Sequence, residues 1–312
     1  MLANFYKLKV GLPRVGSEIF GSRASRPLQE LKTEIESVDS SIYNEILIYT
    51  DIHDENKSLI LELIAFAHSK GFKTGLLTFG VELNDKDLSS LKSSGLDYFV
   101  LRVDSSSEVV LSDLIGVENP FKKIKSFVRN ALDANFSLSF EVVITFLNYK
   151  SLSKLISFLS SSFPLVDSYY LKFVSLDEAS ENKLSLVMPR FMDTELELFR
   201  AFNILDNAKL RVVVEGIPLC YCCDHESSSY ELNLILKDFN TCKSGDIDSL
   251  LNFNESLFSS AYGVCDACKY CFMRPLCPGI KREYLKVYEC KEIYPLFKDV
   301  KTFLNQNGKE EK

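Results

Sequence analysis

The stretch that decides the fold is residues 45–80, EILIYTDIHDENKSLILELIAFAHSKGFKTGLLTFG. It begins with EILIYT, a short apolar run that is typical of a buried strand. Residues 57–71, KSLILELIAFAHSKG, predict a helix, with Asn56 able to cap its start and Gly71 its end. Residues 73–80, KTGLLTFG, predict a second strand. A strand, a helix and a strand in this order indicate two parallel strands joined by a crossover helix.

The same alternation continues in both directions from this stretch. Further strands are expected at 5–12, 96–104, 138–147, 168–176 and 210–219, and further helices at 27–37, 84–95, 120–136, 148–163 and 193–205. Six or seven such units predict an α/β fold, a partial, open (β/α)6 barrel of the TIM type. We expect this barrel at residues 1–215, a small cysteine-rich domain at 216–295, and a helix and tail at 296–312.

Composition and charge argue against two classes of binding partner, nucleic acids and membranes. The 312 residues carry a net charge of −7 with a pI of about 5.2, which argues against non-specific binding to nucleic acid. The sequence has no apolar run long enough to cross a membrane, and its first residues do not resemble a secretory signal. We therefore expect a cytoplasmic protein with neither a membrane nor a nucleic acid as partner.

All nine cysteines lie between Cys220 and Cys290, and four of them lie in CDACKYCFMRPLCPG, residues 265–279. In a reducing compartment such a cluster indicates metal ligands rather than disulfides. Thiolates at this spacing suit tetrahedral zinc or an iron–sulfur cluster, and the plain alternative is a set of buried, inert thiols. The spacing gives no role to the remaining cysteines, which include Cys222, Cys223, Cys242 and Cys290.

Polar side chains follow several of the expected strands, where parallel barrels place their chemistry. They are Thr50, Asp51, His53, Thr78, Asp104, Thr145 and Asn148. Each of them also suits a turn or a helix cap, so no catalytic residue can be singled out. His225 lies among the cysteines and is a weaker candidate ligand than they are.

Two regions resemble the radical S-adenosylmethionine (SAM) enzymes that carry a C-terminal SPASM or twitch-like cluster domain. Residues 45–104 resemble the second to fourth strands of that barrel, with TFG at 78–80 in place of its T-N-G-like turn. FEVVITFLNY and YYLKFVSL resemble its fifth and sixth strands. Cys268, Cys271 and Cys277 match the C-x2-C-x5-C core of the SPASM pattern, with EGIPLC at 215–220 upstream.

The resemblance implies one auxiliary [4Fe–4S] cluster bound by Cys220, Cys268, Cys271 and Cys277. Cys265 competes for one of these places, so the candidate metal ligands are Cys220, Cys265, Cys268, Cys271 and Cys277. The SPASM pattern has a further cysteine four residues after its third, where this chain has Lys281. A second auxiliary cluster is therefore not expected.

The chain departs from the family at the sites that bind SAM. Radical SAM enzymes hold their catalytic cluster on C-x3-C-x2-C after the first strand, whereas GLPRVGSEIFGSR at 11–23 contains no cysteine. DIHD, at 51–54, replaces the G-G-E-P that meets the amino group of SAM. Cleavage of SAM needs a cluster iron with an open coordination position, so the resemblance makes SAM a doubtful cofactor.

Three hypotheses of function remain open. The first is a radical SAM-like protein that cannot cleave SAM and acts as an electron-transfer, substrate-binding or partner subunit through one auxiliary cluster. Its partner would be a catalytic radical SAM enzyme, or a peptide or protein substrate. The second is an active enzyme, either of the radical SAM type with a different cluster arrangement or another barrel enzyme with a non-standard site around Asp51, His53 and Asp104. The third is a structural or interaction protein stabilised by zinc.

Overall fold

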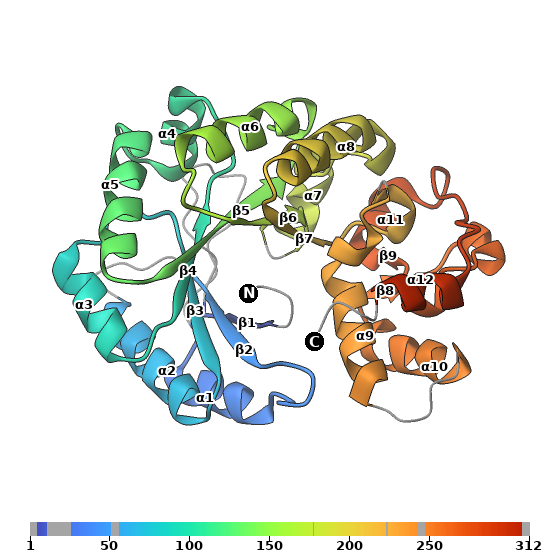
Figure 1. Cartoon of the computed structure of the whole chain (residues 1–312), viewed down its shortest axis with the longest axis horizontal. Coiled ribbons are helices and arrows are strands. Elements are labelled where there is room, and N and C mark those ends of the chain that lie inside the picture. The colour runs from blue at the N-terminus through green and yellow to red at the C-terminus, as the bar shows by residue number, and fades with distance from the viewer. Residues whose placement is uncertain are drawn as a thin grey trace.

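The centre of the molecule is a curled sheet of seven parallel strands that follow one another in chain order (Figure 1). The computed structural model describes residues 5–10, 26–50, 56–176, 178–222, 224–241 and 247–307. The strands are β1 (Phe5–Lys9), β2 (Glu45–Tyr49), β3 (Lys73–Thr78), β4 (Tyr98–Arg102), β5 (Ser137–Ile144), β6 (Ser168–Phe173) and β7 (Arg211–Glu215). The sheet is not closed, because β1 and β7 are its two edges. The predicted partial barrel is confirmed.

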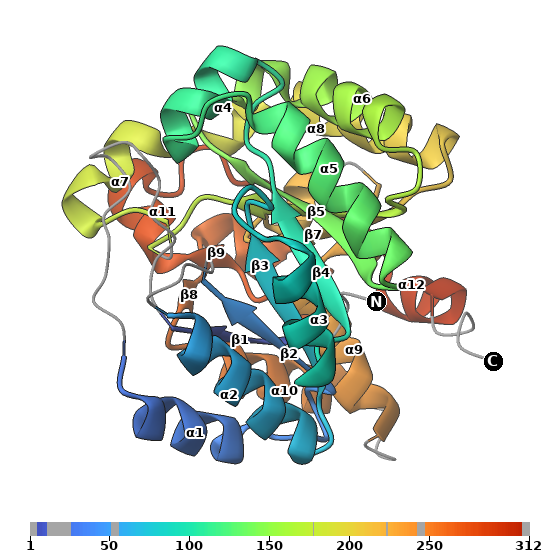
Figure 2. The same ribbon diagram turned by 90° about the vertical axis from the view of Figure 1, so that its left-hand side faces the viewer.

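Helices cover the outer face of this sheet, as Figure 2 shows for α2, α3 and α5. They are α1 (Leu28–Ser37), α2 (Lys57–Ser69), α3 (Asp85–Ser93), α4 (Glu108–Ile115), α5 (Pro120–Asp133), α6 (Leu152–Ser162), α7 (Glu181–Val187) and α8 (Phe191–Asn207). Asn84 caps α3 in a reciprocal capping box with Asp87, and Pro120 opens α5, as predicted. The sequence did not predict α4 or α7.

Two apolar layers hold the barrel together. The larger one lies between the sheet and its helices, and apolar side chains of the C-terminal segment join it. The smaller one lines the concave, inner face and consists of Phe5, Leu47, Tyr49, Leu77, Tyr98, Val100, Tyr170 and Val213. Gly75 makes room in this layer, because a Cβ there would lie 2.2 Å from the Tyr98 ring.

The segment after β7 packs against the open side of the barrel, beside β1 and β7 (Figure 1). Its elements are α9 (Tyr230–Thr241), α10 (Ile247–Phe258), β8 (Tyr262–Gly263), β9 (Ile280–Lys281), α11 (Arg282–Tyr288) and α12 (Val300–Asn307). The Tyr230 hydroxyl donates to the Phe5 carbonyl at 2.5 Å, and Lys237 donates to the Ile42 carbonyl at 2.9 Å. The first bond ties α9 to β1 and the second ties it to the segment before β2. The domain limits near 215 and 295 stay predictions.

None of the helices among the described residues is both long and apolar enough to cross a membrane.

Candidate functional site

Four cysteine thiols from two separate segments lie close enough to influence one another. Cys220 lies in a short 3₁₀ helix, Leu219–Tyr221, directly after β7. Burial raises the pKa of its thiol, and the thiols of Cys277, Cys268 and Cys271 raise it further. Burial likewise raises the pKa of Cys277 to about 11, with a smaller contribution from Cys268 and Cys271. We call Cys220, Cys268, Cys271 and Cys277 the four-cysteine set.

The chemistry of the four-cysteine set fits a soft, positively charged centre. Thiolates that are desolvated and close together repel one another, and a bound metal relieves that repulsion because it stabilises the deprotonated form. The backbone N–H of Leu296 also donates to the Cys271 sulfur at 3.3 Å, the kind of bond that tunes metal-bound thiolates. Among the described residues, however, no group of three or more His, Cys, Asp or Glu side chains is arranged so that it could hold a metal ion.

The loop that carries Cys277 is held by side chains outside it. The Asn254 amide nitrogen donates to three carbonyls, those of Arg274, Pro275 and Cys277, at 3.3, 3.2 and 2.9 Å. Lys281, which stands where the SPASM pattern has a further cysteine, lies 3.6 Å from Glu215 in an ion pair. Since Glu215 precedes Cys220 and Lys281 follows Cys277, this pair ties together the two segments that bear the thiols.

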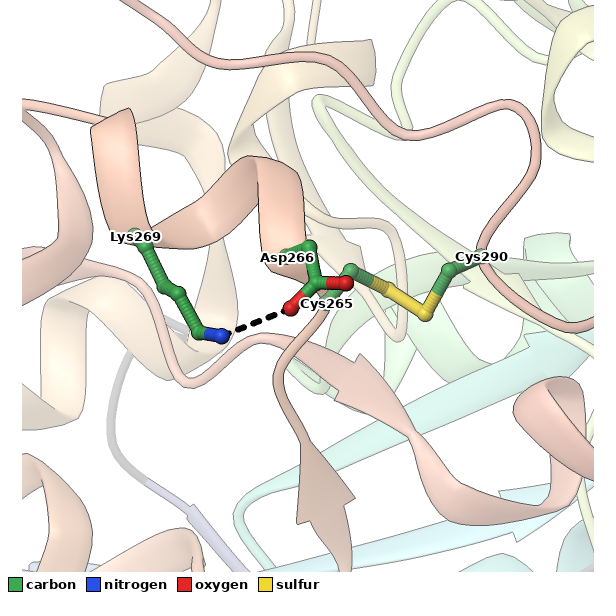
Figure 3. Close-up of a disulfide and its surroundings, with 4 residues drawn as sticks. All are labelled: Cys265, Asp266, Lys269 and Cys290. Atoms are coloured by element: carbon green, nitrogen blue, oxygen red, sulfur yellow. Dashed lines mark hydrogen bonds and ion pairs between the residues drawn. A yellow bond between two sulfur atoms is a disulfide. The ribbon is translucent and has the colours of Figure 1, made fainter.

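Cys265 is not available as a ligand in this structure, because it forms a disulfide with Cys290 (Figure 3). A disulfide sulfur has no thiolate to donate, so the candidate metal ligands reduce to the four-cysteine set. The expectation of reduced cysteines in this cluster therefore fails for Cys265. Cys222 is fully buried, and burial raises the pKa of its thiol, as expected of an inert side chain. Cys223 and Cys242 lie outside the described residues.

Most of the polar residues that follow the strands make turns. The Thr78 hydroxyl accepts from the Gly80 N–H at 3.0 Å, and the Thr145 hydroxyl accepts from Leu147 at 3.2 Å. Asn148 donates to the carbonyls of Val143 and Asp104 at 2.8 and 3.0 Å. Asp51 and His53 lie outside the described residues. His225 stacks on Phe202, with ring centroids 4.3 Å apart.

Asp104 belongs to a buried polar network at the barrel mouth that sequence reasoning missed. It accepts from Arg102 Nε at 2.7 Å and from the Val143 N–H at 2.8 Å. The network contains Tyr49, Arg102, Asp104, Glu141, Lys172 and Glu178, which come from β2, β4, β5, β6 and the segments that follow them. Lys172 forms an ion pair with Glu178, and both side chains are completely buried.

A signal for this network was present in the sequence. Arg102, Glu141 and Lys172 are charged residues inside otherwise apolar strands, and Arg102 and Glu141 are direct partners in the β4–β5 register. A charge in a strand that is buried on both faces is costly, so it indicates a paired or functional group.

Comparison with known protein families finds a match for most of the barrel. The model of the radical SAM superfamily matches residues 13–159, which include β2 to β5. Over these residues the barrel is similar to that of the radical SAM superfamily. The resemblance inferred from the strand order is therefore confirmed at the level of the superfamily.

Solved structures share the fold at low identity. SuiB from Streptococcus suis bound to its precursor peptide SuiA superposes with a TM-score of 0.56 at 13% identity, covering 95% of this chain and 75% of SuiB. SuiB bound to S-adenosylmethionine gives 0.54 at 13% identity, with 95% and 77% covered. The methylornithine synthase PylB gives 0.52 at 9% identity, with 72% of this chain and 69% of PylB covered. At these identities the likeness concerns the fold.

One residue of the radical SAM barrel makes stability depend on pH. Burial raises the pKa of Glu141 from 4.5 to about 7, although Arg102, Lys172 and Lys7 oppose the shift and Glu178 adds to it. The folded state then binds more protons than the unfolded state between these values, so stability falls as pH rises through that window. We expect a loss of about 3 kcal/mol.

Urea unfolding at intervals from pH 5 to pH 8 measures this loss. Glu141→Gln removes the titrating group and keeps the shape, so the difference in slope between the two proteins isolates Glu141. Parallel stability curves for wild type and variant would show that Glu141 does not titrate in this window.

Proposed function

We propose that this chain is a radical SAM-like iron–sulfur protein that holds one auxiliary [4Fe–4S] cluster on the four-cysteine set and does not cleave SAM by itself. The observation that carries the proposal is that Cys277, Cys268 and Cys271 lie close enough to Cys220 to raise the pKa of its thiol, and that Cys268 and Cys271 do the same for Cys277. A cluster bound there would supply one-electron transfer. The chain would act as an electron-transfer, substrate-binding or partner subunit.

Iron–sulfur is favoured over zinc by the family and by the donor set. The superfamily match, with four thiol donors and no histidine among them, supports a cluster, although four thiolates also suit structural zinc. Acid-labile sulfide distinguishes the two, because only a cluster contains it. Zinc without sulfide would favour the structural or interaction protein.

The proposed partner is a catalytic radical SAM enzyme, or a peptide or protein substrate. The structure of SuiB with its precursor peptide SuiA supports a peptide, since its fold covers most of this chain. The likeness concerns the fold, so binding of a peptide by this chain is part of the proposal.

Incubation with SAM tests the catalytic half of the proposal. The reconstituted, reduced protein should form no 5′-deoxyadenosine beyond one turnover, because residues 11–23 contain no thiol to hold a catalytic cluster. A radical SAM enzyme with an intact C-x3-C-x2-C motif is the positive control. Multiple turnovers by this chain alone would favour the active barrel enzyme instead.

A further inference from the structure

A single hydroxyl at the barrel mouth lies between two carboxyl groups. The Tyr49 hydroxyl is 3.0 Å from Glu141 Oε1 and 2.9 Å from Glu178 Oε1. Lys172 Nζ also lies 3.5 Å from the phenol oxygen. A phenol has one proton, so it donates to only one of the two carboxyl oxygens, and its close contact with the other is favourable when that carboxyl carries a proton. The geometry therefore favours a state in which one of the two carboxyl groups is protonated.

Glu141 is the carboxyl that holds the proton. Glu178 is ion-paired with Lys172 and accepts from the backbone N–H and the hydroxyl of Ser175, at 3.0 and 3.1 Å, so it is held ionised. Glu141 makes no ion pair among the described residues, and burial raises its pKa to about 7. With its proton on Oε1 toward Tyr49, its Oε2 is a carbonyl-type acceptor.

Two polar atoms of this network have no partner within the described residues. They are Glu141 Oε2 and Arg102 Nη2, and both are buried. Arg102 is 1% exposed and Glu141 0%. The two residues are register partners on β4 and β5: Arg102 is the last residue of β4, and Glu141 lies opposite it, three residues before the end of β5. Parallel barrels bind their ligands at the carboxyl ends of their strands. A buried donor and acceptor without partners cost about 1–3 kcal/mol each, which a ligand that pairs both would recover.

We propose that Arg102 and Glu141 form a ligand subsite in the barrel mouth for an amide group. An amide offers a carbonyl oxygen to Arg102 Nη2 and an N–H to Glu141 Oε2. The inference concerns the barrel and does not depend on the four-cysteine set.

Charge balance favours an amide over an ionic group. Asp104 already neutralises Arg102, Glu178 neutralises Lys172, and the Lys7 side chain is paired with Glu215. With Glu141 protonated, the charges of these described side chains balance, so they offer no net charge to repay the desolvation of a carboxylate or an ammonium group. A neutral group that carries an acceptor next to a donor can hydrogen-bond to both Arg102 Nη2 and Glu141 Oε2. Its desolvation costs less free energy than that of an ion.

Three probes that share one ring test this chemistry on the full-length protein. Benzamide, benzoate and benzylammonium are compared by saturation-transfer NMR at pH 6.5, with SAM as a competitor. We expect benzamide to bind at least about tenfold more tightly than either ion, because each unmatched hydrogen bond costs about 1.4 kcal/mol. Stronger binding by benzoate, by benzylammonium or by SAM would overturn the proposal, as would no binding of benzamide.

Variants at Glu141 distinguish an effect of hydrogen bonding to the ligand from an effect of side-chain packing. Glutamine reproduces the protonated side chain, since its NH₂ can donate to Tyr49 and its carbonyl can face the ligand. Glu141→Gln should therefore keep benzamide binding, while Glu141→Met, of similar size, should weaken it about tenfold. Equal binding by both variants would contradict the assignment.

Infrared difference spectroscopy detects directly whether the Glu141 carboxyl group is protonated. Addition of benzamide should shift the C=O stretch of a protonated carboxylic acid, and this band should be missing in Glu141→Gln. A benzamide-induced shift that persists in Glu141→Gln would place the ligand elsewhere.

Discussion

Cys271→Ser is expected to abolish iron binding. Serine offers a hard oxygen with a far higher pKa than a thiol, and it replaces a soft thiolate poorly as a ligand of iron. The Cys271 sulfur also accepts the Leu296 N–H, so serine places a shorter side chain against that donor. The measurement is iron per chain after anaerobic reconstitution, together with the visible absorption of the cluster.

Cys265→Ser is the matched control, because Cys265 lies in the same loop but is bonded to Cys290. We expect it to keep the iron content of the wild type. Loss of the cluster in Cys265→Ser with retention in Cys277→Ser would assign the ligands to Cys265, Cys268 and Cys271 instead.

Gly279→Ala is expected to have the largest effect on stability. Gly279 has φ +99°, and a Cβ there would lie 2.2 Å from the Gly263 carbonyl oxygen, a backbone atom of the paired strand β8. The β8–β9 pair would have to separate beside Cys277. We expect a loss of more than about 4 kcal/mol, as for other substitutions that force a backbone clash.

Gly116→Ala is the comparison variant. Gly116 also has positive φ, +69°, but nothing lies within 4 Å of the added Cβ. It should cost only about 1 kcal/mol, the intrinsic penalty of the left-handed conformation. Thermal unfolding of both variants measures the difference, and similar losses would mean that the contact with Gly263 does not matter.

Much of the fold was predictable from local pattern. Residues 45–80 gave two strands and a helix, and the strands pair in parallel as the alternation requires. Helix α4 was missed because Ser105–Ser107 suggested a loop, whereas Ser107 caps the helix and accepts from the Val110 N–H at 3.5 Å. Serine favours both settings, so composition alone could not decide.

The site was predictable only in part, for physical reasons. Spacing grouped Cys268, Cys271 and Cys277, but the partner of Cys265 is Cys290, 25 residues away, and pairings at that range cannot be deduced from sequence. The network of Arg102, Glu141 and Lys172 depends on which face of the curled sheet is inside. That face is set by how the sheet packs on its helices, which the spacing of residues along one strand does not reveal.

Iron and acid-labile sulfide in anaerobically prepared protein test the proposed cluster most directly. The account predicts about four iron and about four sulfide per chain, lost in Cys271→Ser and kept in Cys265→Ser. Zinc bound in place of iron, with no acid-labile sulfide, would contradict it.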